Sequence, residues 1–228
     1  MNDTLASIFH ILIIVAIIWL FRKFKRKSGT QNTRDLEKKS VFEIPTFSKT
    51  AEMLDEDIFW GVIEETFKHA EDQYEQQLFL ISQIKKLTLK QIVGFRLRTD
   101  KLLYDTYSSE MWCAGYIMNG GCSDDSFEYF RCWVISRGKD AYYKAKQNPD
   151  SLISEVNENI DLYDFEDFWY VALDAFKQRT GKDLYDYIDN ENFRTKEGQY
   201  PQFEFTWKEE DPESMRKICP KLYKKFND

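Results

Sequence analysis

The stretch "NGGCSDDSFEYFRCW", residues 119–133, controls how the middle of this 228-residue chain folds. Its two glycines favour a turn, because glycine adopts backbone angles that side chains disfavour. Ser123 stands in the position of an N-cap, so Asp124 and Asp125 would occupy the first turn of a new helix. The positive end of a helix dipole stabilises an anion there by about 0.3–1 kcal/mol. The stretch therefore predicts a turn between two helices.

An apolar stripe follows on the second of these helices. Phe127, Phe130 and Val134 recur at helical spacing. Arg131 lies on the flank of the stripe and needs partners, because burying an unpaired charge is costly. Glu128, three residues earlier, is the local candidate, and carboxylates from other helices are alternatives.

The rest of the chain beyond residue 50 also carries mainly helical patterns. Apolar spacing, caps and terminal glycines predict helices starting near 55, over 73–86, from a Thr88/Gln91 capping box, from about 109 to 120, and over 164–180. Trp60 is expected at the edge of the first helix's core face, which includes Ile58 and Phe67. The alternating "YPQFEFTW" of residues 200–207 predicts a short strand. The fold class is thus all-α, with at most one short C-terminal β element.

Composition supports a folded domain with reduced thiols. Hydrophobic residues make up 43% of the chain and aromatic residues 16%, which argues against disorder. No two of the four cysteines are separated by only two residues, so neither a zinc knuckle nor a thioredoxin-like motif is present. We interpret the cysteines as free thiols in a cytosolic compartment.

The N-terminus predicts a membrane anchor. Residues 5–21, "LASIFHILIIVAIIWLF", carry no formal charge and would span about 25 Å as a helix. His10 lies inside this span, where it could pair helices or bind a proton or ligand. A basic cluster follows at once: Arg22, Lys23, Lys25, Arg26 and Lys27. The positive-inside rule then predicts a single-pass protein of the inner (plasma) membrane, with its N-terminus outside and its main domain in the cytoplasm.

The charge distribution separates the anchor region from the domain. The whole chain carries −7, residues 1–21 carry −1 and residues 22–40 carry +6, which leaves −12 for residues 41–228. Anionic headgroups would bind residues 22–27 at about 1 kcal/mol per basic residue. The acidic domain disfavours nucleic acid as a partner. We expect an anchor at 1–21, a basic region and linker at 22–50, and a helical domain at 51–228.

Several segments together resemble a known family. They are "FW" at 59–60, "MWCAGYIMNGGCSDDSFEYFRCWVISRGKDAYYKAKQNPDSL" at 111–152 and the terminal "CPKLYKKF". The sequence is similar to a bacterial domain of unknown function, DUF family 4240, over approximately residues 55–190. Cys219 and Lys221 depart from the residues expected near the end. The resemblance implies a helical fold, and it brings no activity, substrate, cofactor or catalytic residue.

Two functional hypotheses follow from residues 119–133. In the first, Asp124, Asp125 and Glu128 form a carboxylate cluster of a hydrolase-like or metal-dependent enzyme, and Arg131 binds an anion. No histidine accompanies them, and the sequence lacks a nucleophile elbow, a P-loop and a dinucleotide fingerprint. An enzyme requires the aspartates and Arg131 to converge on an open pocket.

In the second hypothesis, which we favour, these residues belong to the scaffold of a membrane-anchored protein-interaction or ligand-binding module that is not an enzyme. An aromatic groove would then bind the ligand or a protein partner. The candidate binding residues are Trp60, Trp112, Asn119, Asp124, Asp125, Glu128, Arg131 and Trp133. The alternative for the tryptophans is an ordinary place in the core. A scaffold requires Arg131 to be buried among carboxylates and carbonyls.

Overall fold

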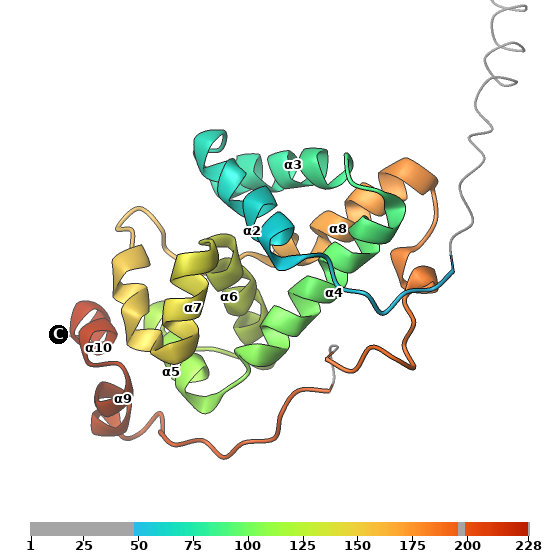
Figure 1. Ribbon diagram of the computed structural model, residues 1–228. Coiled ribbons are helices and arrows are strands. Elements are labelled where there is room, and N and C mark those ends of the chain that lie inside the picture. The colour runs from blue at the N-terminus through green and yellow to red at the C-terminus, as the bar shows by residue number, and fades with distance from the viewer. Residues whose placement is uncertain (1–47, 196–198, 228) are drawn as a thin grey trace, which may run out of the picture. The chain divides into compact units, whose positions relative to one another are not determined.

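Helix α4 (Leu89–Asp105) runs through the middle of the domain (Figure 1). A capping box between Thr88 and Gln91 starts it, and most of its residues are buried, since it packs against α2, α6 and α8. The computed structural model describes residues 48–195 and 199–227. The other helices are α2 (Glu56–Glu65), α3 (Gln73–Ile84), α5 (Ser109–Asn119), α6 (Asp124–Ser136), α7 (Lys139–Gln147), α8 (Glu166–Thr180), α9 (Pro212–Ile218) and α10 (Pro220–Asn227).

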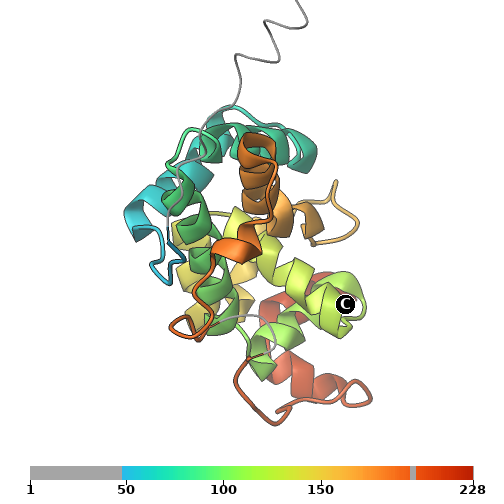
Figure 2. The ribbon, with the colours of Figure 1, turned by 90° about the vertical axis from the view of Figure 1, so that its right-hand side faces the viewer.

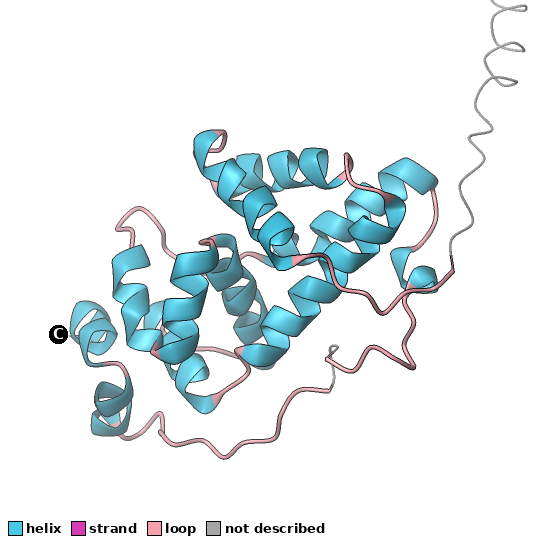
Figure 3. Ribbon diagram, viewed as in Figure 1, coloured by secondary structure: helices cyan, strands magenta, loops and turns pink. Residues whose placement is uncertain are grey.

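Short 3-10 helices and loops connect these elements, and the described residues contain no strand (Figure 3). The 3-10 segments are η1 (Thr66–Lys68), η2 (Pro149–Glu155) and η3 (Leu184–Tyr187). Figures 1 and 2 place α9 and α10 at the end of the domain opposite α3. The all-α fold class is therefore confirmed for the described residues.

The turn at residues 119–133 forms as expected. Gly120 ends α5 in the left-handed conformation, with φ +66°. Ser123 accepts the backbone amide of Ser126 at 3.3 Å and so caps α6, whose first turn contains Asp124 and Asp125. The interactions involved all lie within a few residues, which is why the sequence predicts them.

Two expectations about the first helical segment are wrong: the place of Trp60 at the edge of the core face, and the burial of Ile58 and Phe67 in it. Trp60 is not at the edge of the α2 core face: it is 1% exposed, whereas Ile58 and Phe67 are 43% and 51% exposed. The reason is that α7 also packs near α2, and its Tyr142 ring lies 5.4 Å from that of Trp60. The buried face of α2 is therefore turned toward α7 as well as α4.

The predicted strand at residues 200–207 is absent, because no neighbouring strand offers a hydrogen-bonding ladder. The segment is an extended loop whose aromatic rings pack on the helices instead. Tyr200 stacks on Tyr107 with 4.3 Å between ring centres, and Phe205 lies 5.3 Å from Trp112. The alternation of residue types thus reflects one side of a loop that lies against the domain.

The chain end is held by a distant carboxylate. Pro220 begins α10, and Asp150 accepts the backbone amides of Lys221 and Leu222, both at 2.9 Å. Asp150 lies in η2 and is 3% exposed. Because a carboxylate at a helix start satisfies free amides and favours the dipole, this contact fixes the last helix on the domain.

The predicted membrane anchor, residues 5–21 with His10, and the basic cluster at 22–27 lie outside the described residues. Within the described part of the chain, every helix is too short or too polar to cross a bilayer.

Candidate functional site

Arg131 lies on α6 and is enclosed, with 1% of its surface exposed. Its Nη1 donates a 2.5 Å hydrogen bond to the carbonyl of Leu103, and its Nε donates to the carbonyl of Phe127 at 3.2 Å. The rings of Tyr107, Phe127 and Tyr200 surround its guanidinium carbon at 5.0, 4.5 and 4.7 Å. Leu103 belongs to the last turn of α4, whose carbonyls carry partial negative charge, and its carbonyl otherwise accepts only from Thr106 at 3.3 Å. Arg131 therefore caps the end of α4.

The acidic residues of α6 have different surroundings. Asp124 and Asp125 are exposed at the helix start. Glu128 is partly buried and accepts a 3.1 Å hydrogen bond from the hydroxyl of Tyr200. In residues 48–195 and 199–227, no group of three His, Cys, Asp or Glu side chains could hold a metal ion. The structure thus places the aspartate pair at the surface, whereas the guanidinium of Arg131 is enclosed.

Trp112 and Asn119 hold the turn between α5 and α6 in place. Trp112 donates from its indole nitrogen to the carbonyl of Cys122 at 2.9 Å, and its ring stacks 4.3 Å from that of Phe127. Asn119 exchanges two hydrogen bonds with the backbone of Tyr163: it accepts the amide at 2.8 Å and donates to the carbonyl at 3.2 Å. Their polar groups are accordingly used within the protein.

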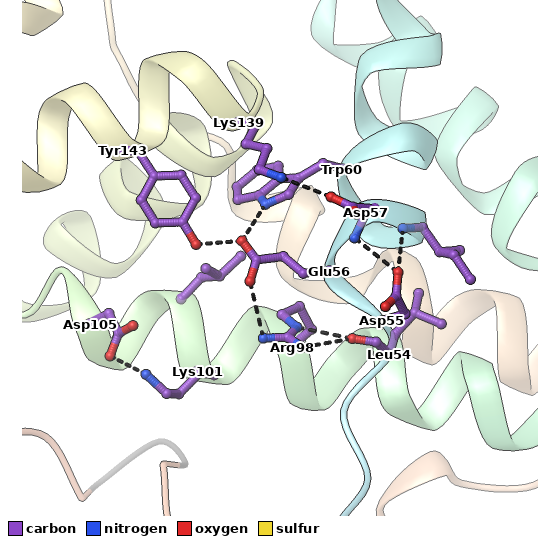
Figure 4. Close-up of polar contacts among 12 residues, drawn as sticks. Leu54, Asp55, Glu56, Asp57, Trp60, Arg98, Lys101, Asp105, Lys139 and Tyr143 are labelled. Carbon is purple, nitrogen blue, oxygen red and sulfur yellow. Dashed lines mark hydrogen bonds and ion pairs between the residues drawn. The ribbon is translucent and has the colours of Figure 1, made fainter.

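Trp60 belongs to a polar network around Glu56, between α2, α4 and α7 (Figure 4). Glu56 accepts hydrogen bonds from the indole of Trp60 at 3.1 Å and from the hydroxyl of Tyr143, and Arg98 lies 3.7 Å away. The bond from Tyr143 is the main cause that lowers the pKa of Glu56. Burial first, and then Glu56, raises the pKa of Tyr143 to about 12. At neutral pH the carboxylate is therefore charged, the phenol is protonated, and the network joins three helices.

A hollow of about 140 Å³ lies where η1, the start of α3 and the end of α6 meet. We call it the Arg137 hollow. It is lined by Thr66, Phe67, Ala70, Glu71, Asp72, Gln73, Gln76, Trp133, Arg137, Asn157 and Ile160. The Phe67 ring forms one wall of the hollow and lies close to Gly138, whose φ is +91°. A Cβ at position 138 would come within 3.1 Å of this ring, so glycine leaves the room that the ring needs. The hollow therefore depends on the glycine that follows α6.

Arg137 carries the positive charge of this hollow. It is partly buried at the C-terminal cap of α6, and it donates to Gln76 Oε1 at 3.0 Å and to Ser136 Oγ at 3.2 and 3.3 Å. Among the described residues no carboxylate lies within ion-pair distance of it. Burial lowers the pKa of Arg137, and Glu155 opposes this effect from a greater distance. The carbonyls that end α6 give the cation partial compensation.

Trp133 also lines the hollow, and its indole nitrogen is enclosed by the protein. Its side chain is fully buried, between the rings of Phe130 and Tyr163. Its indole N–H has no hydrogen-bond partner among the described residues. A buried donor left unpaired costs about 1–3 kcal/mol, so native proteins rarely keep one without a reason. The Arg137 guanidinium carbon lies 5.9 Å from the centre of the Trp133 ring.

Sequence reasoning identified Trp133 but missed Arg137, Gln76 and the hollow itself. Arg137 precedes the glycine at the end of α6, where a basic residue is common for helix stability alone. Gln76 reaches Arg137 from 61 positions away in the chain. No local pattern distinguishes this arginine from Arg131, six residues earlier, because only tertiary contacts separate their environments.

Comparison with known proteins places this site within a described family. Residues 54–178 match the model of a family described as "Protein of unknown function (DUF4240)". This range contains every residue that lines the Arg137 hollow and the whole Glu56 network. The family resemblance seen in the sequence is thereby confirmed. No curated protein and no solved structure matches the chain.

Proposed function

The chain belongs to the DUF4240 family, whose function is unknown, and we propose that it is a membrane-anchored module that binds a small ligand in the Arg137 hollow. One observation carries the proposal: Arg137, whose hydrogen bonds go to the neutral groups of Gln76 and Ser136, lines one hollow together with apolar side chains such as Phe67 and Ile160. Ligand pockets typically combine apolar walls with a few convergent polar groups of this kind.

The membrane anchor is part of the proposal and rests on the sequence. An uncharged span at residues 5–21 followed by the basic cluster at 22–27 supports a single-pass protein of the inner membrane, whose domain faces the cytoplasm. The basic cluster would bind anionic headgroups. A tether of this kind raises the local concentration of the domain for any protein partner at the membrane surface.

The geometry favours binding over the hydrolase-like alternative. Asp124 and Asp125 are exposed at a helix start, whereas Arg131 is buried, donates to backbone carbonyls and lies among aromatic rings. An enzyme that used these groups together would need them around one open pocket. The Arg137 hollow contains none of the three residues.

The proposal is tested by ligand-observed NMR on the full-length protein in detergent, with a panel of small anionic, cationic and neutral fragments. Fragments that bind the wild type should lose binding in Arg137→Gln. Arg194→Gln is the matched control, because Arg194 is exposed and lines no part of the hollow. Equal fragment binding by wild type and Arg137→Gln would show that the hollow is not the site.

A further inference from the structure

We infer that the surface shared by α3 and α8 binds a basic amphipathic helix of a partner protein. We call this surface the α3–α8 face, and its side chains are Tyr74, Leu78, Glu166, Asp167, Tyr170 and Asp174. The apolar side of the partner helix would lie on the leucine and the two tyrosines, and its lysines and arginines would pair with the carboxylates. The inference goes beyond ligand binding in the Arg137 hollow and does not depend on it.

Hydrogen bonds at both ends hold α3 and α8 side by side (Figures 1 and 2). At their starts, Gln73 donates from Nε2 to the carbonyl of Asp164 at 2.7 Å. At their ends, Lys85 donates from Nζ to Gln178 Oε1 at 3.0 Å. Because start meets start and end meets end, the two helices run in the same direction and present one continuous surface.

Three large side chains with apolar bodies stand exposed on the neighbouring flanks of these helices. Tyr74 and Leu78 on α3 are 66% and 49% exposed, and Tyr170 on α8 is 40% exposed. Leu78 follows Tyr74 by four positions and precedes Lys85 by seven, so all three share the flank of α3 that reaches α8. Tyr170 precedes Gln178 by eight positions and shares the facing flank. Exposed apolar side chains that gather on one surface mark interaction sites, whereas scattered ones do not.

The two segments that form this face carry acidic charge without basic charge. Residues 70–84 contain three Asp/Glu and residues 157–176 contain six, and neither segment contains Lys or Arg. Three carboxylates of the face have no basic side chain within ion-pair distance among the described residues: Glu166, Asp167 and Asp174. Burial first, and then repulsion from Glu166, raises the pKa of Asp164. The negative potential of the face is therefore left for a partner to compensate.

The charge of the face selects the class of partner. Anionic lipid headgroups and nucleic acid carry the same sign of charge and would be repelled. A second copy of the chain would bring the same carboxylates close to one another, which also costs free energy. A basic protein segment is attracted instead, and complementary charge speeds its association and fixes its orientation.

The spacing of the apolar side chains suits a helix as the partner segment. Tyr74 and Leu78 lie one turn apart, which is about 6 Å along α3 at a rise of about 1.5 Å per residue. A partner helix repeats its apolar residues at the same interval when they stand three or four positions apart. Lysines and arginines beside that stripe can cover apolar surface with their stems while their charges reach the carboxylates. A basic amphipathic helix therefore matches both the apolar and the acidic side chains.

The test measures the binding of synthetic peptides to the full-length protein by biolayer interferometry in a nonionic detergent, with the signal of empty micelles subtracted. The probe is an amphipathic helix of leucine and lysine with its leucines at helical spacing. One control peptide has the same composition with its leucines spread around the helix, and the other replaces every lysine by glutamate. We expect the probe to bind at least tenfold more tightly than either control peptide.

Variants of the α3–α8 face locate the bound probe. Leu78→Ser should weaken its binding at least tenfold and Tyr170→Ser at least threefold, whereas the matched control Ile58→Ser, at a site 43% exposed on α2, should change it less than twofold. Asp167→Asn should weaken binding at least threefold. Its control Asp186→Asn, at an exposed position in η3, should again change it less than twofold. Circular dichroism verifies the fold of each variant.

Several results would overturn the inference. Equal binding of the probe by wild type, Leu78→Ser and Tyr170→Ser would show that the peptide binds elsewhere. Equal binding of the peptide with spread leucines would reduce the attraction to charge alone, and tighter binding of the glutamate peptide would reverse its sign. A wild-type dimer in sedimentation analysis that Leu78→Ser dissociates would make a second copy the occupant. Arg137→Gln should bind the probe like the wild type, so failure of this inference leaves the proposed ligand site standing.

Discussion

Replacing Arg131 by methionine should destabilise the domain strongly, although methionine preserves much of the buried volume. The substitution removes the hydrogen bonds to the carbonyls of Leu103 and Phe127 and the contacts with three aromatic rings. Hydrogen bonds from a charged group are each worth about 1.5–3 kcal/mol, and a buried cation–π contact about 1–2 kcal/mol. The carbonyl of Leu103 then keeps only the longer hydrogen bonds from the amide and the hydroxyl of Thr106, both at 3.3 Å.

The opposing effect is the cost of keeping a cation buried, which the substitution relieves. This desolvation amounts to several kcal/mol, so it cancels part of the loss. We expect a net decrease of about 2–4 kcal/mol in the free energy of unfolding. Arg131→Lys keeps the charge but lacks the planar fork, so its loss should be about half as large.

Urea denaturation followed by far-UV circular dichroism measures this difference, with Arg137→Gln as the comparison on the same helix. Arg137 is partly exposed and holds only neutral partners. Its replacement should cost no more than about 1 kcal/mol. The reasoning is refuted if Arg131→Met unfolds within about 0.5 kcal/mol of the wild type, or if Arg137→Gln is the more damaging of the two.

Three further predictions concern other parts of the domain. Asp150→Ala removes the acceptor of two amides at the start of α10, of which that of Leu222 is buried. It should lower the unfolding free energy by about 1–3 kcal/mol in the same urea assay, and a wild-type midpoint would contradict the cap. Burial raises the pKa of Cys122 to about 12, so iodoacetamide should label it in the native protein at pH 8 more than tenfold slower than in urea. Equal labelling rates would exclude this shift. The hydrogen bond from Tyr143 lowers the pKa of Glu56, so its contribution to stability is present above the unfolded pKa of about 4.3 and is lost as pH falls through the folded pKa. Glu56→Gln should therefore lose less stability than the wild type between about pH 5 and pH 3, and an unchanged pH profile would show that Glu56 contributes nothing.

Local interactions explain which parts of the fold were predictable. The caps by Ser123 and by Thr88 with Gln91, and the glycine end at Gly120, all join residues at most four positions apart. Their physical cause is present in the sequence itself. The predicted strand at 200–207 failed for the complementary reason, because a strand requires a neighbour that no local pattern reveals.

The candidate site was only partly predictable, because its properties come from contacts between distant segments. That Arg131 needs partners follows from its place on an apolar stripe, but the partners themselves, Leu103 and Tyr200, lie 28 positions before it and 69 after it. Trp133 was a candidate because of its type alone. That its indole N–H lacks an acceptor, and that the Arg137 guanidinium lies 5.9 Å from its ring centre, follows only from the tertiary packing around α6.

The indole N–H signal of Trp133 gives the most direct test of the account. Trp133→Phe assigns this signal among those of the six tryptophans in the ¹H–¹⁵N spectrum of the full-length protein. On addition of a fragment that binds the wild type, this signal should shift, because Trp133 lines the Arg137 hollow, and it should remain unchanged in Arg137→Gln. If the fragment binds and the Trp133 signal does not move, the ligand does not occupy the Arg137 hollow.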